Sequence, residues 1–389
     1  MSARLLFVIN EAYFFLSHRL AVAKAAMDDG WEVHVAAPKE HVWAPPNFSV
    51  DELKKEGFIF HSIPLSRRGT NPLVEIKTFF SLLKLYQKIR PDIIHHITIK
   101  PNLYGGLAAR LTGIPSVVFA FTGLGQIFID RGLKAYFLRA IVKALLGISL
   151  NHSNKKIIFQ NMDDQENFIN LRIISRESSV VIRGSGVDLD KFSFTPITKG
   201  TPMVVLASRL IWEKGVSDFV SAARLLHKKN IKARFILVGD TQPSNPRAVP
   251  KSVLETWVRE NIIEWWGYRS DMTSILSQCH IVCLPSIYGE GVPKILLEAA
   301  AVGRAVVSNN VPGCREAVID GVSGYLVPPK DIDALADRLY ELIKNPDLAD
   351  RLGREGRQFM EDAFDEHSIA STTLMVYRSL WNQKKTMDE

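Results

Sequence analysis

Residues 280–303 read HIVCLPSIYGEGVPKILLEAAAVG and carry the strongest local signal in the sequence. The continuous apolar run at residues 280–285 is typical of a strand that is buried on both faces of a parallel sheet. Gly289 and Gly291 then predict a loop, and Pro293 suits the first turn of the helix that follows. A strand, a glycine loop and a helix start together present backbone N–H groups and the positive end of a helix dipole. This arrangement suits a bound phosphate.

Two glutamates, Glu290 and Glu298, flank the predicted helix start with seven residues between them. A carboxylate beside an anion is unfavourable unless it accepts hydrogen bonds from neighbouring hydroxyl groups. Glu298 is placed to bind the diol of a ribose, and Glu290 to hold a hydroxyl of a hexose. The alternative is an ordinary helix with Glu290 near its N-terminus and Glu298 in solvent.

A second signal, ASRLIWEKG at residues 207–215, comes directly after the apolar run MVVLAS. A Rossmann unit carries its phosphate loop at this place, but the G-x-G-x-x-G pattern is absent, which argues against a dinucleotide cofactor. Arg209 and Lys214 instead supply two cations. Fixed cations can neutralise a diphosphate leaving group in the transition state without a metal ion. The alternative is two surface cations on a loop.

Apolar strand patterns alternate with helical patterns in both halves of the chain, which predicts parallel sheets covered by helices on both faces. The expected strands of the first half are residues 5–10, 32–38, 91–98, 115–121, 155–160 and 179–188, with helices at 17–29 and 103–111. The expected strands of the second half are residues 203–208, 233–240, 262–268, 280–286 and 304–310, with helices at 217–229, from about 253 and from about 292.

A turn-rich stretch without helical periodicity lies between Asp188 and Thr201 and separates the two halves. The fold class that follows is α/β, with two doubly wound Rossmann-like domains that face a central cleft. The expected domains are residues 1–190 and residues 191–364, and a C-terminal helix at about residues 365–385 is expected to pack back on the first domain. Ligands of such sheets bind at the carboxyl ends of the strands.

Composition narrows the class of protein. Hydrophobic residues make up 47% of the chain and charged residues 23%, and no apolar run is long enough to span a bilayer. The apolar N-terminus is interrupted by polar residues and lacks a cleavage site, so we expect a buried first strand rather than a signal peptide. The three cysteines, Cys279, Cys283 and Cys314, argue against a disulfide framework and fit a cytosolic compartment. For Cys279 and Cys283, burial around one strand is favoured over a metal pair.

The formal net charge of +7 is uneven. Residues 1–190 hold 23 basic and 17 acidic side chains, a net of +6, whereas residues 191–389 hold 25 and 24, a net of +1. A basic first half fits an anionic membrane surface or a phosphorylated acceptor. Nucleic acid ranks last among the partners, because the sequence has no nucleic-acid-binding motif.

In combination these stretches resemble the family 4 retaining glycosyltransferases of the GT-B fold. The matching segments are RGSGVDLDKF, ASRLIWEKGV, ARFILVGD and residues 265–329, and they cover most of residues 183–329 in the expected order. The E-x7-E pattern of the family corresponds to Glu290 and Glu298. The resemblance implies that no metal or other cofactor is needed, because the nucleotide sugar is itself a substrate.

The resemblance also implies roles for single residues in the second domain, which would bind the nucleotide sugar. Arg209 and Lys214 would hold the donor diphosphate, Glu298 the ribose hydroxyls, and Glu290 the donor sugar. Arg209, Lys214 and Glu290 form the implied catalytic group. The implied donor-binding residues are Arg209, Lys214, Gly239, Tyr268, Arg269, Glu290, Gly291, Val292, Pro293, Lys294 and Glu298.

Residues 8–38 and 95–125 resemble members that build bacterial polysaccharides, such as O-antigen, or glycan-lipid intermediates. This implies transfer of a hexose or N-acetylhexosamine from a UDP-sugar to a lipid-diphosphate-linked sugar, by an enzyme at the inner face of the membrane. The first domain would bind this acceptor. Two departures are seen: residues 10–15 replace a glycine-rich loop, and residues 122–125 lack the usual His or Asp. The acceptor-side candidates are Asn10, Phe15, His18, Lys100, Thr122 and Gly123.

Three weaker signals remain open. His18 is either an acceptor-side acid/base or phosphate ligand, or a packing or capping residue. His95 and His96 should lie on opposite faces of one strand, and structural roles are favoured for both. Residues 131–156 contain no acid but six basic residues with apolar ones between them. They form either a helix lying on anionic lipid or a domain helix with one core face.

The implied mechanism is domain closure that excludes water and brings an acceptor hydroxyl to the anomeric carbon. The leaving diphosphate then accepts the hydroxyl proton on the same face, so no nucleophile of the enzyme is needed, and Glu290 is not assigned as one. A nucleotide-sugar epimerase of the same fold and a non-catalytic nucleotide-sugar-binding partner are the alternatives. An oxidoreductase fits least, because neither first-strand loop has the dinucleotide pattern.

Overall fold

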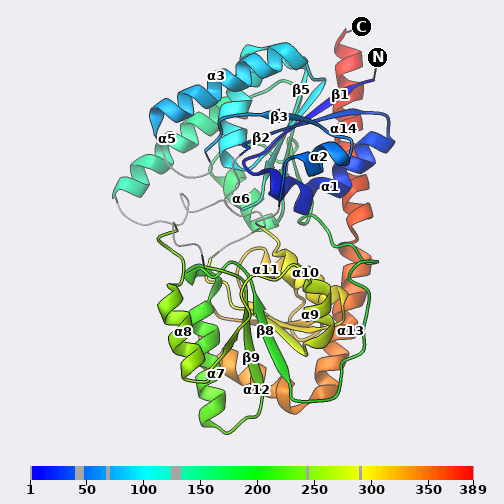
Figure 1. Cartoon of the computed structure of the whole chain (residues 1–389). Coiled ribbons are helices and arrows are strands. Elements are labelled where there is room, and N and C mark those ends of the chain that lie inside the picture. The colour runs from blue at the N-terminus through cyan, green and yellow to red at the C-terminus, as the bar shows by residue number, and fades with distance from the viewer. Residues whose placement is uncertain are drawn as a thin grey trace. The chain divides into compact units, whose positions relative to one another are not determined.

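The computed structural model describes residues 2–39, 48–66, 71–123, 133–241, 245–288 and 291–388. The chain divides into two compact units (Figure 1). Unit 1 consists of Met1–Ser185 and His367–Glu389, and unit 2 of Gly186–Glu366. Along the described residues no helix is both long and apolar enough to cross a membrane.

Unit 1 contains a seven-stranded parallel sheet in the order β3-β2-β1-β4-β5-β6-β7. The direction of winding reverses between β1 and β4, so the carboxyl ends of these two strands form the topological switch point of the unit. The strands are β1 (Arg4–Val8), β2 (Glu32–Ala37), β3 (Ile59–Ser62), β4 (Ile93–Ile97), β5 (Ser116–Phe121), β6 (Lys155–Phe159) and β7 (Ser179–Val181).

Helices cover both faces of this sheet, because alternate side chains of each strand point to opposite sides. Leu5 and Phe7 of β1 pack in one core with residues of α1, α2 and α14, and Leu6 and Val8 pack in another with α3 to α6. The helices are α1 (Ala12–Asp28), α2 (Asp51–Lys55), α3 (Pro72–Ile89), the π-helical η1 (Pro101–Gly105), α4 (Gly106–Leu111), α5 (Leu133–Ser149), α6 (Met162–Asn170) and α14 (Glu366–Asp388).

Unit 2 contains a six-stranded parallel sheet in the order β10-β9-β8-β11-β12-β13, with its switch point between β8 and β11. Its strands are β8 (Met203–Ala207), β9 (Arg234–Val238), β10 (Glu264–Trp265), β11 (Ile281–Leu284), β12 (Ala305–Asn309) and β13 (Gly324–Val327). The helical elements are η3 (Trp212–Lys214), α7 (Val216–Lys228), α8 (Lys251–Arg259), α9 (Met272–Gln278), α10 (Lys294–Ala301), α11 (Cys314–Ala317), α12 (Ile332–Lys344) and α13 (Pro346–Ala363).

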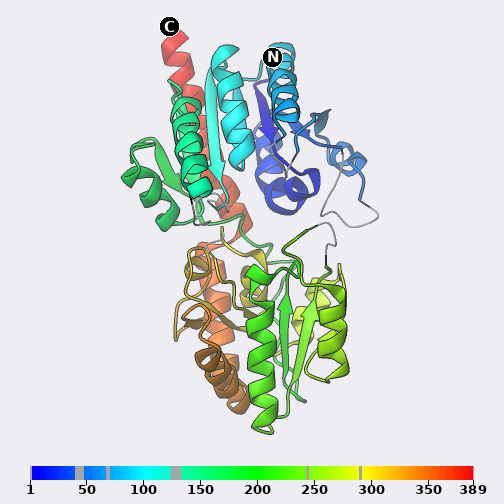
Figure 2. The same ribbon diagram turned by 90° about the vertical axis from the view of Figure 1, so that its left-hand side faces the viewer.

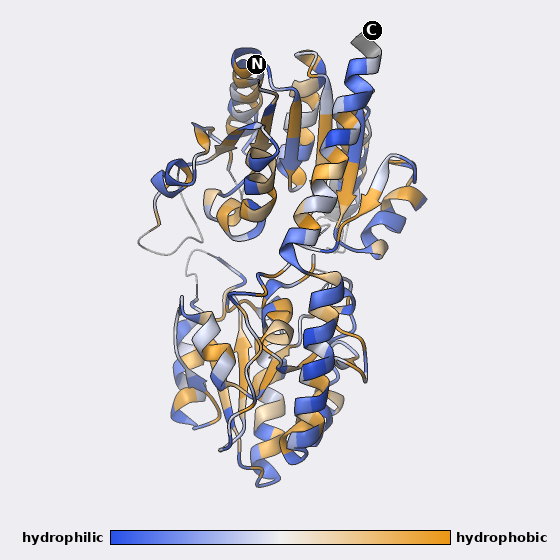
Figure 3. Ribbon diagram, turned by 90° about the vertical axis from the view of Figure 1, so that its right-hand side faces the viewer, coloured by the Kyte–Doolittle hydropathy of each residue, from blue (hydrophilic) through white to orange (hydrophobic). Residues whose placement is uncertain are grey.

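The view turned by 90° shows helices on both sides of the sheet in each unit (Figure 2). The strands are drawn largely in the hydrophobic colours (Figure 3). Their buried side chains form one hydrophobic core on each face of each sheet. The predicted α/β class with two doubly wound parallel sheets is therefore confirmed.

The turn-rich stretch after Asp188 contains no helix or strand between residues 188 and 202, yet it is anchored to unit 2. Phe192 is buried in the core of that unit. The fully buried guanidinium of Arg304 donates to the backbone oxygen of Thr195 at 2.6 Å. The division between the units falls at Ser185, just before this stretch.

Candidate functional site

The two segments that carry the sequence signals of unit 2 follow β8 and β11, on either side of its switch point. The backbone N–H of Ile287 donates to the backbone oxygen of Glu213 at 3.0 Å, and this hydrogen bond joins the two loops directly. Gly215, with φ of 72°, lies so close to Pro285 that a Cβ would stand 1.9 Å from the Pro285 oxygen. Glycine is required there, because both the conformation and the contact exclude a side chain.

The loop after β8 brings positive charge to this edge. Lys214 is buried at the end of η3, and Arg209 is half-buried near the start of the loop. Glu213 lies between them in sequence, and its Oε1 pairs with an Arg247 guanidinium nitrogen at 2.8 Å. Because the charge of Arg247 offsets that of Glu213, the charges of Arg209 and Lys214 remain. The loop therefore contributes a net positive field where an anion would bind.

Glu298 lies on α10, one turn after Lys294 and on the same helix face. Burial raises the pKa of the Glu298 carboxyl to about 7, although the charges of Lys294 and Lys191 act to lower it. Lys191 was not among the predicted site residues. It lies in the turn-rich stretch, where no local pattern relates it to an acid on a distant helix.

The loop between β11 and α10 is only partly described. Gly289 and Glu290 lie outside the described residues, whereas Gly291, Val292 and Pro293 are buried. The Asn309 amide, at the end of β12, donates to the oxygens of Pro285 and Ser286, each at 3.0 Å, and fixes the start of this loop. Asn309 was also missed, although a buried polar residue at the carboxyl end of a strand is a usable signal.

The remaining donor-side candidates lie at the ends of β9 and β10. Gly239 follows β9, and its oxygen accepts a hydrogen bond from the Trp265 indole at 2.9 Å. Tyr268 is exposed. The Arg269 guanidinium makes an ion pair with Asp271 at 2.5 Å, so much of its charge is already matched within its own loop.

In unit 1, the acceptor-side candidates cluster by topology. Asn10 follows β1, Lys100 follows β4, and Thr122 and Gly123 follow β5, so all four lie at the carboxyl edge of adjacent strands. The Lys100 ammonium contacts Glu75 at 2.5 Å and the backbone oxygen of Ser66 at 2.8 Å. Residues 124 and 125 of the same predicted loop lie outside the described residues.

His18 and Phe15 on α1 have different surroundings. The His18 ring stacks on Phe14 with centroids 4.0 Å apart, and its Nδ1 lies 2.7 Å from the Ser17 hydroxyl. Phe15 is fully buried and packs edge-to-face on Phe7 and Phe58. This position departs from the expectation for Phe15, because its ring is part of the core of unit 1.

The connection after β4 is strained. Thr98 has φ of 78°, in the left-handed region that β-branched residues rarely adopt. The turn that follows, η1, is π-helical, a rare geometry that is frequent at functional sites. The Thr98 hydroxyl and the Asn102 amide oxygen are buried without a hydrogen-bond partner in this structure. No sequence pattern had singled out either residue.

His95 and His96 lie on opposite faces of β4, as expected. The His95 Nδ1 is 2.6 Å from the Tyr377 hydroxyl of α14, and the His96 Nε2 is 2.8 Å from the Tyr86 hydroxyl of α3. Burial lowers the pKa of His96 to about 3. All three cysteines are buried. The described ranges contain no group of three or more His, Cys, Asp or Glu side chains placed to hold a metal ion.

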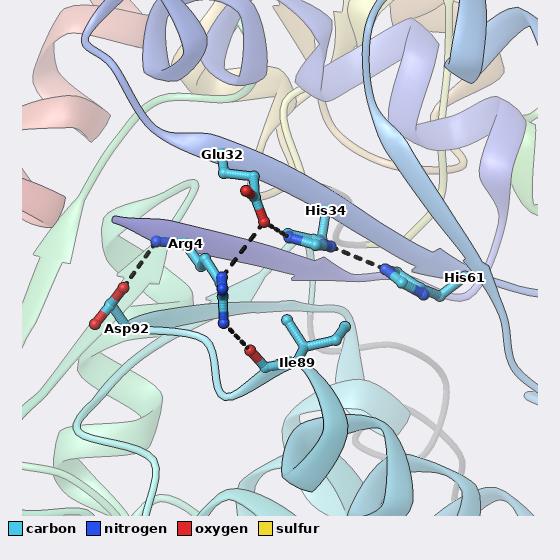
Figure 4. A network of polar contacts seen from close by, with 6 residues as sticks. All are labelled: Arg4, Glu32, His34, His61, Ile89 and Asp92. Atoms are coloured by element: carbon cyan, nitrogen blue, oxygen red, sulfur yellow. Dashed lines mark hydrogen bonds and ion pairs between the residues drawn. The ribbon is translucent and has the colours of Figure 1, made fainter. Parts of the chain in front are cut away.

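A second polar network lies at the other end of the unit 1 sheet (Figure 4). A Glu32 oxygen contacts the His34 ring at 2.6 Å and the Arg4 guanidinium at 3.4 Å. His34 in turn contacts His61 at 2.9 Å. Arg4 and Glu32 begin β1 and β2, at the amino ends of the strands, away from the edge where parallel sheets bind ligands. The network therefore joins three strands and is not part of the candidate site.

Two family models match the chain. The one for glycosyl transferases group 1 covers residues 189–359, and the glycosyl transferase 4-like one covers residues 4–161. The chain is 30% identical over 387 residues to the N,N'-diacetylbacillosaminyl-diphospho-undecaprenol alpha-1,3-N-acetylgalactosaminyltransferase of Campylobacter jejuni, covering 93% of this chain and 97% of that one. It is 26% identical over 291 residues to the UDP-Gal:alpha-D-GlcNAc-diphosphoundecaprenol alpha-1,3-galactosyltransferase of Escherichia coli, covering 71% and 73% of the two chains.

Solved structures are similar over nearly the full length. Sucrose-phosphate synthase from Thermosynechococcus elongatus aligns with a TM-score of 0.80 at 18% identity, covering 98% of this chain and 100% of that one. WaaG, a glycosyltransferase involved in lipopolysaccharide biosynthesis, aligns with a TM-score of 0.71 at 14% identity, covering 95% and 98%. At these identities the likeness shows the fold alone.

Proposed function

The chain belongs to the group 1, or family 4, glycosyltransferases of the GT-B fold, and on this premise we propose that it extends a bacterial lipid-linked glycan. It transfers N-acetylgalactosamine or galactose from a UDP-sugar to a sugar linked to undecaprenyl diphosphate, with retention of configuration. One observation carries the proposal: the similarity to the Campylobacter jejuni transferase, at 30% identity, extends over 93% of the chain and so through both sheets.

The donor binds at the switch point of unit 2. The diphosphate lies against the loops after β8 and β11, where Arg209 and Lys214 supply positive charge. Glu298 accepts hydrogen bonds from the ribose, and Glu290 holds a hydroxyl of the sugar. This proposal is supported by the hydrogen bond between the two loops and by the lysines that face Glu298.

The reaction needs charge stabilisation more than covalent catalysis. When the bond between the anomeric carbon and the diphosphate breaks, negative charge develops on the leaving oxygen. Arg209 and Lys214 stabilise that charge from fixed positions. The leaving oxygen takes the proton of the acceptor hydroxyl on the same face, so no metal ion is required.

The acceptor binds at the carboxyl edge of the unit 1 sheet, and its lipid places the enzyme on the inner face of the membrane. Tyr136, Ile141 and Ile148 of α5 are exposed apolar residues in the basic first half of the chain, which supports contact with anionic lipid. Arg131, which belongs to the same predicted basic stretch, lies outside the described residues. Binding to vesicles should need anionic lipid and weaken at high salt.

A transfer assay tests the function. The enzyme is incubated with UDP-N-acetylgalactosamine, UDP-galactose, UDP-glucose or UDP-N-acetylglucosamine, with and without undecaprenyl-diphosphate-linked N-acetylglucosamine or diacetylbacillosamine. We expect a product one sugar heavier, with release of UDP, only when the acceptor is present. Conversion of the donor sugar without acceptor would instead identify an epimerase. Donor binding without UDP release in any combination would identify a non-catalytic binding protein.

A further inference from the structure

A small, partly open cavity lies in unit 1 and is lined by residues of α1, α14 and the sheet. Arg19, His95 and Thr373 are among its lining residues, together with Gln160 and Gly184, which follow β6 and β7. The cavity therefore adjoins the carboxyl edge of the sheet, where parallel α/β units bind their ligands. It has room for about one water-sized group.

Arg19 brings a buried positive charge to this cavity. Its side chain is 6% exposed, and one terminal nitrogen donates to the His18 backbone oxygen at 3.1 Å. Its Nε is buried without a hydrogen-bond partner, and no Asp or Glu in the described part of the chain forms an ion pair with it. Burial lowers the pKa of Arg19 to about 10, so the group is still charged at neutral pH. A buried cation without a counter-ion is unstable relative to a paired one.

His95 supplies a second polar atom at the same cavity. Its Nε2 is buried and has no partner in this structure, while its Nδ1 lies against the Tyr377 hydroxyl. Burial and the neighbouring Arg19 charge hold the pKa of His95 well below its ordinary value, so the ring is neutral. If the tyrosine donates to Nδ1, the proton of the ring is on Nε2. Arg19 and His95 then each bring to the cavity an N–H donor that has no hydrogen-bond partner.

We propose that this cavity is an anion site, which receives one anionic oxygen of the acceptor diphosphate, or a chloride-sized anion when no acceptor is bound. The inference rests on the proposed function for the identity of the ligand. A water molecule would satisfy the hydrogen bonds but would not offset the charge of Arg19. A whole phosphate group does not fit, so the phosphorus atom stays outside and a single oxygen enters.

Substitution of Arg19 tests the site. In Arg19→Met, KM for the undecaprenyl-diphosphate-linked acceptor should rise by about tenfold or more, because a charge-assisted hydrogen bond is lost. KM for the UDP-sugar should stay within about twofold, and the thermal midpoint should hold or rise, because an unpaired buried charge has been removed. Arg19→Lys keeps the charge but lacks the guanidinium fork, so its KM for the acceptor should lie between those of the wild type and Arg19→Met. Arg110→Met is the control, since it removes an exposed arginine that does not line this cavity, together with one hydrogen bond to the Ile148 backbone oxygen.

A second arm uses anions alone. At equal ionic strength, chloride should raise the thermal midpoint of the wild-type protein above its value in gluconate, and Arg19→Met should abolish that difference. If Arg19→Met lowers the midpoint by several degrees and leaves acceptor KM unchanged, the residue is structural and the anion site is wrong. If the difference in thermal midpoint between chloride and gluconate persists in Arg19→Met, the proposed anion site is also contradicted. If the wild-type protein transfers no sugar, the proposed function fails, and the chloride comparison alone decides the anion site.

Discussion

Glu298 would couple the stability of the protein to the proposed binding of the donor ribose. Its carboxyl has a pKa of about 7 in the folded protein, above its ordinary value, and burial is the main cause. A carboxyl whose folded pKa is raised stabilises the protein only in its protonated form. That contribution is complete below about pH 4.5 and is lost as pH rises through 7. A bound ribose would compensate by donating hydrogen bonds to the ionised group.

We therefore expect Glu298→Gln to stabilise the ligand-free protein at pH 8 by about 1–2 kcal/mol and to have no effect near pH 4.5. The same variant should bind UDP about tenfold more weakly, because an amide accepts hydroxyl protons poorly. Denaturant titrations at both pH values and calorimetry with UDP measure the two effects. Glu355→Gln, at an exposed position on α13, is the control. A stability gain confined to acidic pH would contradict the assignment.

Lys214 should matter for turnover far more than for folding. We expect Lys214→Ala to lower kcat/KM by about a hundredfold, because a fixed cation no longer stabilises the leaving diphosphate. Its thermal midpoint should change by only a few degrees. Lys251→Ala removes an exposed cation of the same unit and should leave turnover unchanged. Activity of Lys214→Ala within a few-fold of wild type would be incompatible with a diphosphate clamp.

The residues predicted from sequence are those whose role is visible locally. Arg209, Lys214 and Glu298 each belong to a short motif next to an apolar strand, and the fold places their motifs at the switch point. Lys191, whose charge acts on Glu298, and Arg19, which lines the proposed anion site, were not predicted, because their significance depends on neighbours distant in sequence. The expectation for Phe15 differs from the structure for another reason. An aromatic ring in a segment that leads from a loop into a helix can pack in the core as readily as it can contact a ligand, and only its burial distinguishes the two cases.

Among the elements, the connection between β4 and η1 stores strain that a single substitution can reveal. A β-branched residue with a φ of 78° costs about 1–3 kcal/mol. Thr98→Gly should unfold with a free energy about 1 kcal/mol higher than that of Thr98→Ala, because both lack the hydroxyl but only glycine relaxes the backbone. Equilibrium unfolding in urea measures the difference. Equal stabilities for the two variants would show that the left-handed conformation carries no penalty.

The central strands of both sheets were predictable from the sequence. The errors lie at the edge strands and at the first residues of helices. The first helix was expected from about residue 17, but α1 begins at Ala12. The Ser17 hydroxyl instead donates to the Tyr13 oxygen inside the helix, at 3.0 Å. The edge strand β13, which begins at Gly324, was not among the expected strands. A Cβ there would lie 2.5 Å from the Val306 oxygen, so close strand packing requires the glycine.

For the chain as a whole, sequence periodicity sufficed to predict two α/β sheets, since each repeats strand and helix in order. A C-terminal helix that packs on the first domain was expected, but the individual contacts of α14 are long-range and could not be derived from periodicity. Tyr377 and Leu380 of this helix are buried in unit 1, and Lys384 contacts Asp92 at 2.7 Å. Only the folded arrangement brings Tyr377 to His95, and so forms a buried polar pair between the end of the chain and β4.

These buried histidines should make unit 1 the more acid-sensitive part of the molecule. The pKa of His96 is lowered to about 3 by burial, and that of His95 lies well below its ordinary value for the same reason. A histidine with a depressed folded pKa contributes stability that is complete above about pH 6.5 and is lost as pH falls toward the folded value. His96 should therefore weaken unit 1 by about 1.4 kcal/mol per pH unit between pH 6 and 4, and His95 should act in the same direction.

Hydrogen exchange followed by mass spectrometry at pH 7 and pH 4.5, corrected for the intrinsic rate, measures this unit by unit. We expect peptides from β1, β4 and β5 to lose protection at pH 4.5, whereas those from β8, β11 and β12 keep more of theirs. Unit 2 is the internal control, because among its described residues no histidine is fully buried. Equal losses in both units would mean that acid acts through carboxylates spread over the chain. Earlier loss in unit 2 would contradict the assignment of acid sensitivity to His95 and His96.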